Sequence, residues 1–114
     1  MASYCPRQGD VVWLSFDPQA GHEQAGNRPA LVISPDAYNR KTNLVLCCPI
    51  TNQQKGYPFE VKIPQGIQVS GVVLSDQVKC LDWKARKAKF CCRLTPETFS
   101  EVVGKLSTLI NKSL

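Results

Sequence analysis

Residues 11–33 read VVWLSFDPQAGHEQAGNRPALVI, a short apolar segment, a polar loop and a second short apolar segment. The two apolar segments are rich in Val, Leu and Ile and are bounded by turn residues, so we expect them to be β-strands. The same pattern recurs along the chain. The complete set of predicted strands is Val11–Phe16, Ala30–Ile33, Leu44–Pro49, Phe59–Ile63, Val72–Ser75, Gln77–Cys80 and Ala88–Arg93. Many short strands in a small domain favour a closed or nearly closed β-barrel over a sandwich.

The last twenty residues follow a different pattern. Thr95 offers a capping hydroxyl, Pro96 suits the first helical position, and Glu97 lies near the positive end of the helix dipole. The apolar residues that follow recur every three or four positions, at Phe99, Val102, Val103, Leu106, Leu109 and Ile110. We therefore expect a mainly β fold with one amphipathic C-terminal helix. By the same capping argument, a shorter helix begins at Ser34-Pro35-Asp36.

Length and composition predict a single domain over residues 1–114. The chain carries 14 Lys and Arg against 9 Asp and Glu, and 43% of its residues are hydrophobic. This composition excludes disorder as the main state. We see no transmembrane segment and no signal peptide at the N-terminus, so we expect no membrane association and a cytoplasmic location.

The six cysteines do not form a recognisable disulfide or zinc framework. They contain no CxxC spacing, and the chain has a single histidine. Neighbours in a strand point to opposite faces, so we expect the pairs Cys47/Cys48 and Cys91/Cys92 each to place at most one thiol in the core. We interpret the cysteines as reduced, structural thiols, and we expect no metal site and no cofactor.

Positive charge is concentrated near the end of the chain. Six cations lie within residues 79–93, opposed only by Asp82, and Trp83 lies among them. Such a stretch suits a polyanion, because Lys and Arg release counterions from phosphates and an aromatic ring stacks on a base. Two alternatives stay open: the lysines protect a solvated strand edge, and Trp83 belongs to the core. The cations are Lys79, Lys84, Arg86, Lys87, Lys89 and Arg93.

The polar loop at residues 17–29 holds three groups suited to phosphoryl chemistry. His22 and Glu23 are proton-transfer residues, and Arg28 can stabilise a phosphoryl oxyanion. Thr51 and Asp76 lie at two further strand ends, where each is equally suited to completing a turn. The chain lacks a Walker loop, GxGxxG, GxSxG, HExxH and clustered carboxylates, so any phosphoryl transfer here must proceed without a metal.

Four separated motifs resemble the MazF/PemK family of toxin endoribonucleases from type II toxin–antitoxin systems. They run in the family's order, and the resemblance extends from Gly9 to Ile110. The motifs are Gly9-Asp10-Val11-Val12-Trp13, the loop from Asp17 to Ala30, Lys55-Gly56-Tyr57-Pro58-Phe59-Glu60 and Ser75-Asp76-Gln77-Val78-Lys79.

The resemblance implies a fold, a reaction and partners. The fold is a small SH3-like barrel of the CcdB/MazF type, acting as a homodimer. The reaction is sequence-specific, metal-independent cleavage of single-stranded RNA: the 2′-hydroxyl attacks the phosphate and leaves 2′,3′-cyclic phosphate and 5′-hydroxyl ends. Cutting messenger RNA in this way inhibits translation and growth. The inhibitor is a MazE/PemI-like antitoxin with an acidic, disordered tail.

Site residues also follow from the resemblance. The MazF branch assigns Glu23 as general base or its orienter, Arg28 as stabiliser of the phosphorane and Thr51 as a hydroxyl donor to the phosphate. His22 and Asp76 match the set favoured in the PemK branch, whose arginine position is Leu74 here, so we keep them as accessory catalytic candidates. The candidate RNA contacts are Asn27, Asn52, Gln53, Lys55, Gln77, Lys79, Trp83, Lys84 and Arg86.

Two other functions are compatible with this fold: a non-enzymatic inhibitor of DNA gyrase like CcdB, and an RNA-binding module without catalysis. The combination of Glu23, Arg28 and Thr51 favours the nuclease, because a pure binding protein has no need of it.

Overall fold

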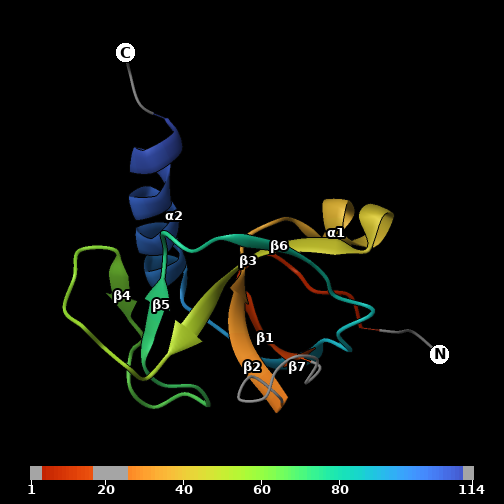
Figure 1. The fold of residues 1–114 in the computed structure, drawn as a ribbon, viewed down its shortest axis with the longest axis horizontal. Helices are drawn as coiled ribbons and strands as arrows, with labels where there is room; N and C mark the ends of the chain where they lie inside the picture. Colours follow the sequence, from red (N-terminus) through yellow and green to blue (C-terminus); the bar gives the residue numbers. More distant parts are fainter. Residues whose placement is uncertain (1–3, 17–25, 112–114) are drawn as a thin grey trace.

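A computed structural model describes residues 4–16 and 26–111, which form seven strands and two helices (Figure 1). All seven predicted strands occur, with shifted ends, and none of the described helices is long and apolar enough to cross a membrane. In chain order the elements are β1 (Asp10–Phe16), β2 (Gly26–Val32), α1 (Asp36–Thr42), β3 (Leu44–Thr51), β4 (Glu60–Lys62), β5 (Val72–Leu74), β6 (Lys79–Asp82), β7 (Lys89–Arg93) and α2 (Pro96–Ile110).

The strands form one antiparallel sheet in the order β4-β5-β3-β2-β1-β7, and β6 also pairs with β3. In the described part of the chain β4 and β7 do not pair with each other, so the sheet is not closed. The mainly β fold with a C-terminal helix is as predicted, and of the closed and nearly closed barrels expected only full closure is wrong. Helix α2 packs against the sheet: its Val102 lies in one buried cluster with Val61 of β4 and Cys92 of β7.

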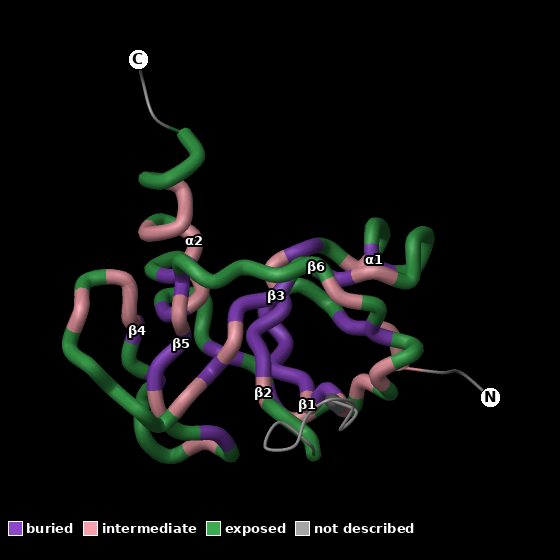
Figure 2. The backbone as a smooth tube through the Cα atoms, viewed as in Figure 1, coloured by how far each residue is buried: buried purple, intermediate pink, exposed green. Residues whose placement is uncertain are grey.

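The three central strands are buried on both faces. Neighbouring residues of β1 separate into two cores: Val11 packs in the cluster that includes Val102 of α2, and Val12 packs in the cluster that includes Trp83. We call these the helix-side core and the tryptophan-side core. Figure 2 shows the buried stretches along β1, at the end of β2 and within β3. Because these strands are covered on both faces, they carry apolar residues in succession and not in alternation.

Two-sided burial corrects the expectation for one cysteine pair. Cys47 lies in the tryptophan-side core and Cys48 in the helix-side core, so both thiols are buried instead of one. Burial raises the pKa of Cys47 to about 11 and that of Cys48 to about 12. Both thiols are therefore uncharged at neutral pH.

The two helices begin differently. The predicted cap of α2 is confirmed: the Thr95 hydroxyl accepts a hydrogen bond from the Thr98 amide at 3.2 Å. Helix α1 begins after Pro35, without a side-chain cap, so the capping argument there is wrong. Ser34 instead donates to Asn39 Oδ1 at 2.5 Å and accepts from the Leu46 amide, which ties α1 to β3.

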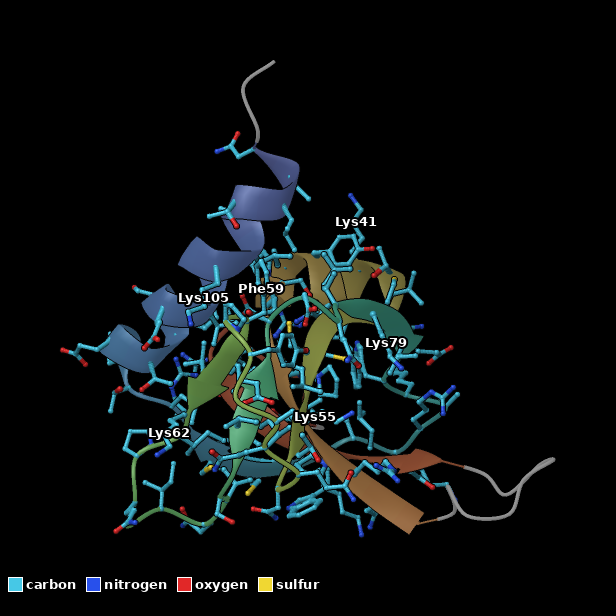
Figure 3. All side chains as sticks on the ribbon, turned by 60° about the vertical axis from the view of Figure 1, so that its left-hand side comes forward. Lys41, Lys55, Phe59, Lys62, Lys79 and Lys105 are labelled. Carbon is cyan, nitrogen blue, oxygen red and sulfur yellow. The ribbon has the colours of Figure 1, made fainter. Side chains whose placement is uncertain are left out.

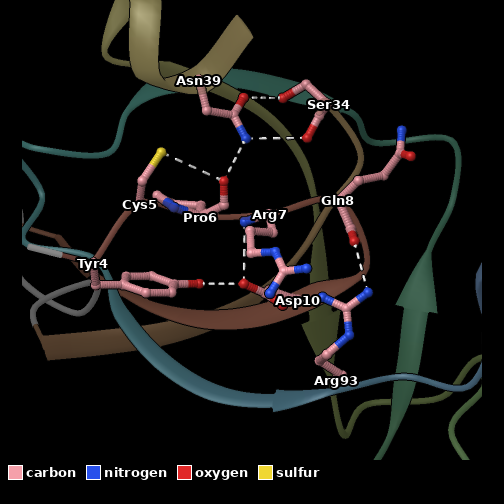
Figure 4. Close-up of polar contacts among 9 residues, drawn as sticks. All are labelled: Tyr4, Cys5, Pro6, Arg7, Gln8, Asp10, Ser34, Asn39 and Arg93. Carbon is pink, nitrogen blue, oxygen red and sulfur yellow. Dashed lines mark hydrogen bonds and ion pairs between the residues drawn. The ribbon is translucent and has the colours of Figure 1, made fainter. Parts of the chain in front are cut away.

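A buried carboxylate joins the N-terminal segment to both β1 and β7 (Figure 4). Asp10 is 2% exposed and accepts hydrogen bonds from the Tyr4 hydroxyl at 2.6 Å, the Arg7 amide at 3.1 Å and the Arg93 guanidinium at 2.6 Å. Burial and the bond to Asp10 raise the pKa of Tyr4. Every oxygen of this buried acid therefore has a donor, as burial of a charge requires.

We expect Asp10→Ala to lower the free energy of unfolding by about 2 kcal/mol, because it leaves three donors without their acceptor. Urea denaturation followed by tryptophan fluorescence measures the change. Glu101→Ala is the control: it removes an exposed pair with Lys105 at 3.8 Å and should change stability by less than about 0.5 kcal/mol. Equal effects of the two substitutions would contradict the account.

Candidate functional site

A pocket of about 540 Å³ opens beside the central strands. Arg28, Pro29 and Ala30 enter from β2, and the end of β3 adds a wall through Thr51. Seven of the predicted site residues line this one pocket, although they are scattered over more than fifty positions of the sequence. They are Arg28, Thr51, Gln53, Lys55, Asp76, Gln77 and Lys79.

The remaining predicted residues lie elsewhere. His22 and Glu23 fall outside the described residues. Four further candidates for RNA contact are absent from the pocket lining: Asn27, Asn52, Lys84 and Arg86. Two of these have partners within the fold, since Asn52 accepts from the Ser70 hydroxyl at 3.0 Å and Arg86 donates to the Ser15 carbonyl at 3.4 Å.

Trp83 belongs to the core, and its assignment as an RNA contact is wrong. It is 6% exposed, and its indole N–H donates to the Asn39 carbonyl at 2.9 Å. A ring packed in the tryptophan-side core has no free face for a base to stack on. Of the two interpretations of Trp83 drawn from the sequence, the one that places it in the core is confirmed.

Arg28 is held by regular strand pairing. The structure extends β2 back to Gly26, so Arg28 pairs with Leu14 of β1, and the expectation that it belongs to the loop at residues 17–29 is wrong. Its side chain is exposed and lines the pocket. The position of the guanidinium therefore depends on a strand buried at its other end, which limits the motion of its backbone.

A close backbone approach holds the end of β3. The Thr51 hydroxyl accepts from the Gln53 amide at 3.1 Å, which turns the chain out of the strand. Gly71 has a φ of +110°, and a Cβ there would lie 2.3 Å from the Thr51 carbonyl oxygen. Glycine at position 71 is thus required for β5 to lie against Thr51.

Asp76 has a partner within the pocket. The Tyr57 hydroxyl donates to Asp76 Oδ1 at 2.9 Å, and this hydrogen bond raises the pKa of Tyr57. Both residues line the pocket. Tyr57 was not among the residues predicted from its chemistry, and its only signal was its place in the Lys55-Gly56-Tyr57-Pro58 motif.

Glu60, the last residue of the same motif, is a second pocket residue to which the sequence analysis assigned no role. Its carboxylate accepts the backbone amides of Lys55 at 2.8 Å and Gly56 at 3.0 Å. Lys55 and Lys79, labelled in Figure 3, come from the segment before β4 and from the start of β6. Together with Arg28 they bring three cations to the pocket.

The arrangement suits an anionic ligand with apolar parts. Three cations line the pocket, and both of its carboxylates, Glu60 and Asp76, accept hydrogen bonds from the protein. Leu14 and Ile50 add apolar surface. Across residues 4–16 and 26–111, no group of three His, Cys, Asp or Glu side chains is placed to hold a metal ion. A phosphodiester with its bases meets these conditions.

Comparison with known proteins gives the family. The family model of the PemK-like, MazF-like toxins of type II toxin–antitoxin systems matches residues 7–110 of this sequence. The chain is 47% identical over 110 residues to the endoribonuclease toxin MazF of Escherichia coli K12, covering 96% of this chain and 98% of that protein. It is 40% identical over 107 residues to the endoribonuclease PemK of E. coli, covering 90% and 80% of the two chains.

Solved structures agree. The chain superposes on MazF in a MazE–MazF crystal structure from Deinococcus radiodurans with a TM-score of 0.92 and 51% identity, covering 97% of this chain and all of that one. A crystal structure of MazF alone from the same organism gives a TM-score of 0.86, with 96% and 99% of the chains covered. This chain therefore belongs to the PemK-like, MazF-like toxin family of type II toxin–antitoxin systems.

Proposed function

We propose that the pocket binds single-stranded RNA and cleaves it by attack of a 2′-hydroxyl on the adjacent phosphate, leaving 2′,3′-cyclic phosphate and 5′-hydroxyl ends. The observation that carries this proposal is the convergence of Arg28 and Thr51 with Lys55 and Lys79 on one pocket. Attack in line needs the phosphate held and its developing charge neutralised. These side chains supply both.

The protein is an endoribonuclease toxin, as its full-length similarity to MazF and PemK indicates. This enzyme class disfavours the CcdB-like inhibitor of gyrase and the inactive RNA-binding module. The target proposed here is messenger RNA, so the toxin would act in the cytoplasm and stop translation.

The residues divide into distinct roles in the proposed reaction. Arg28 neutralises the non-bridging oxygens of the phosphorane, and the Thr51 hydroxyl donates to the same phosphate. Glu23 takes the proton of the 2′-hydroxyl or orients the group that does, and His22 returns a proton to the leaving 5′-oxygen. Asp76 acts as an accessory group through its position beside Tyr57.

The proposed partners are a second copy of the chain and an antitoxin of the MazE/PemI type. Apolar side chains remain exposed in the described residues, including Ile110 at 76% and Leu109 at 50% at the end of α2. A small domain has too little interior to cover every apolar face, and a homodimer buries more of them. An acidic antitoxin tail would complement the three pocket cations.

Arg28→Ala should lower the cleavage rate about a hundredfold or more, because it removes the main charge that stabilises the dianionic transition state. Its stability should stay near wild type, since the side chain is exposed. The measurement is single-turnover cleavage of a long transcript. Arg40→Ala, an exposed arginine of α1, is the matched control and should retain full activity. A near wild-type rate for Arg28→Ala would refute its role.

Two lysines of the basic stretch should behave differently. Lys79 lines the pocket and Lys84 does not. We expect Lys79→Ala to reduce the slope of log affinity against log salt concentration by about 0.7, the value for one phosphate of a single strand, and Lys84→Ala to leave the slope unchanged. Anisotropy titrations with an uncleavable RNA provide the slopes. An identical response of both variants would assign the pocket no special part in binding.

Sedimentation velocity at micromolar concentration tests the homodimer. We expect a single species of twice the chain mass, because dimerisation covers apolar surface that the monomer exposes. A stable monomer under these conditions would exclude the dimer as the form that binds RNA.

A further inference from the structure

A carboxylate in a pocket proposed to bind a polyanion needs an explanation. Glu60 lines the pocket together with Arg28, Lys55 and Lys79. By charge alone it repels phosphate and weakens RNA binding. The hydrogen bonds of Glu60 provide a reason for its presence.

Both oxygens of Glu60 are used by one short turn. Oε2 accepts the Lys55 amide at 2.8 Å and Oε1 accepts the Gly56 amide at 3.0 Å. Gly56 has a φ of +81°, a conformation that needs glycine and that presents two successive amides to one acceptor. A carboxylate is the side chain with two acceptor oxygens for such a pair.

Other bonds hold the same segment from two further sides. The Lys105 ammonium of α2 donates to the carbonyls of Pro58 at 2.5 Å and Glu60 at 3.3 Å. The Ser75 hydroxyl donates to the Phe59 carbonyl at 2.6 Å. Residues 58–60 are thereby fixed to the body of the protein, so Glu60 connects the turn at residues 55–56 to a rigid support.

We propose that Glu60 is a positioning residue for RNA binding: its carboxylate holds the Lys55-Gly56 backbone in the conformation that directs Lys55 to the pocket. This inference rests on the proposed function of the pocket. Glu60 then strengthens RNA binding although its charge repels phosphate, because the benefit of a correctly placed Lys55 exceeds the repulsion from a carboxylate that is already bonded to two amides.

The substitution Glu60→Gln separates charge from position. Loss of a negative charge by itself would tighten RNA binding and leave the salt slope nearly unchanged. The substitution also replaces one acceptor oxygen with an amide NH2 group, which cannot accept a hydrogen bond from a backbone N–H. One of the two bonds to the Lys55-Gly56 turn is therefore lost, and the turn becomes more mobile. We therefore expect Glu60→Gln to weaken binding of an uncleavable 2′-O-methyl RNA severalfold and to lower the salt slope by about 0.7, as Lys55→Ala does.

The experiment compares wild type, Lys55→Ala, Glu60→Gln and the double variant by anisotropy across a salt series. Because Glu60 acts through Lys55, the double variant should bind no more weakly than Lys55→Ala alone. Glu97→Gln is the matched control: it removes the same charge from an exposed position on α2 that lines no part of the pocket, and should not weaken binding. Urea denaturation confirms that each variant is folded.

Amide hydrogen exchange supplies a measurement that needs no RNA. The Lys55 and Gly56 amides should exchange faster in Glu60→Gln than in wild type, and unchanged exchange would overturn the inference at its structural step. Tighter RNA binding by Glu60→Gln, or additive effects in the double variant, would overturn its functional step. The proposed function fails separately, if wild type does not bind RNA or if removing Arg28, Lys55 and Lys79 leaves binding unchanged.

Discussion

Burial of β1, β2 and β3 on both faces is the constraint on which the rest of the structure depends. A helix covers one face through Val102, and the segment around Trp83 covers the other. Polar groups in the middle of such strands would be buried without partners, so the side chains that do chemistry lie at strand ends or on the segments between strands. Arg28 lies near the start of β2 and Thr51 at the end of β3.

The same constraint also explains where three acidic side chains lie in this basic protein and which groups they bind. Asp10 is buried, and the hydrogen bonds that it accepts join the N-terminal segment to β7. Asp76 and Glu60 lie in the pocket, where one accepts from Tyr57 and the other from two backbone amides. In each case the carboxylate organises neighbouring groups, and the cations of the pocket remain available to an anionic ligand.

The strands and the C-terminal helix could be predicted from sequence, because local periodicity and capping groups determine them. Whether the sheet closes could not be predicted from sequence, since closure depends on whether α2 or β7 lies next to β4. The burial of Trp83 was ambiguous because charged residues precede and follow it whether it faces solvent or the core. The number of buried thiols at Cys47 and Cys48 was predicted wrongly, because the alternation of side chains along a strand does not show whether one or both faces of the sheet are covered.

The candidate site shows the same division. Arg28, Thr51 and Asp76 could be named from their chemistry and from family motifs, and the structure brings them to one pocket. Glu60 was named only as the last residue of a family motif, and its role could not be predicted, because a glutamate gives no sequence signal that its carboxylate will accept the amides of residues four and five positions earlier. Its part in the pocket depends on the turn at Gly56 and on a contact from α2, both set by the tertiary fold.

The central claim is that these side chains cleave RNA through its own 2′-hydroxyl without a metal. The most direct measurement is cleavage of a transcript by the purified protein in excess EDTA, with the new ends analysed chemically and a matched substrate carrying a single 2′-deoxy nucleotide at the cut site. The account predicts undiminished cleavage in EDTA, 2′,3′-cyclic phosphate and 5′-hydroxyl ends, and no cleavage at the deoxy position. Loss of activity in EDTA, or cleavage of the deoxy substrate at that position, would contradict it.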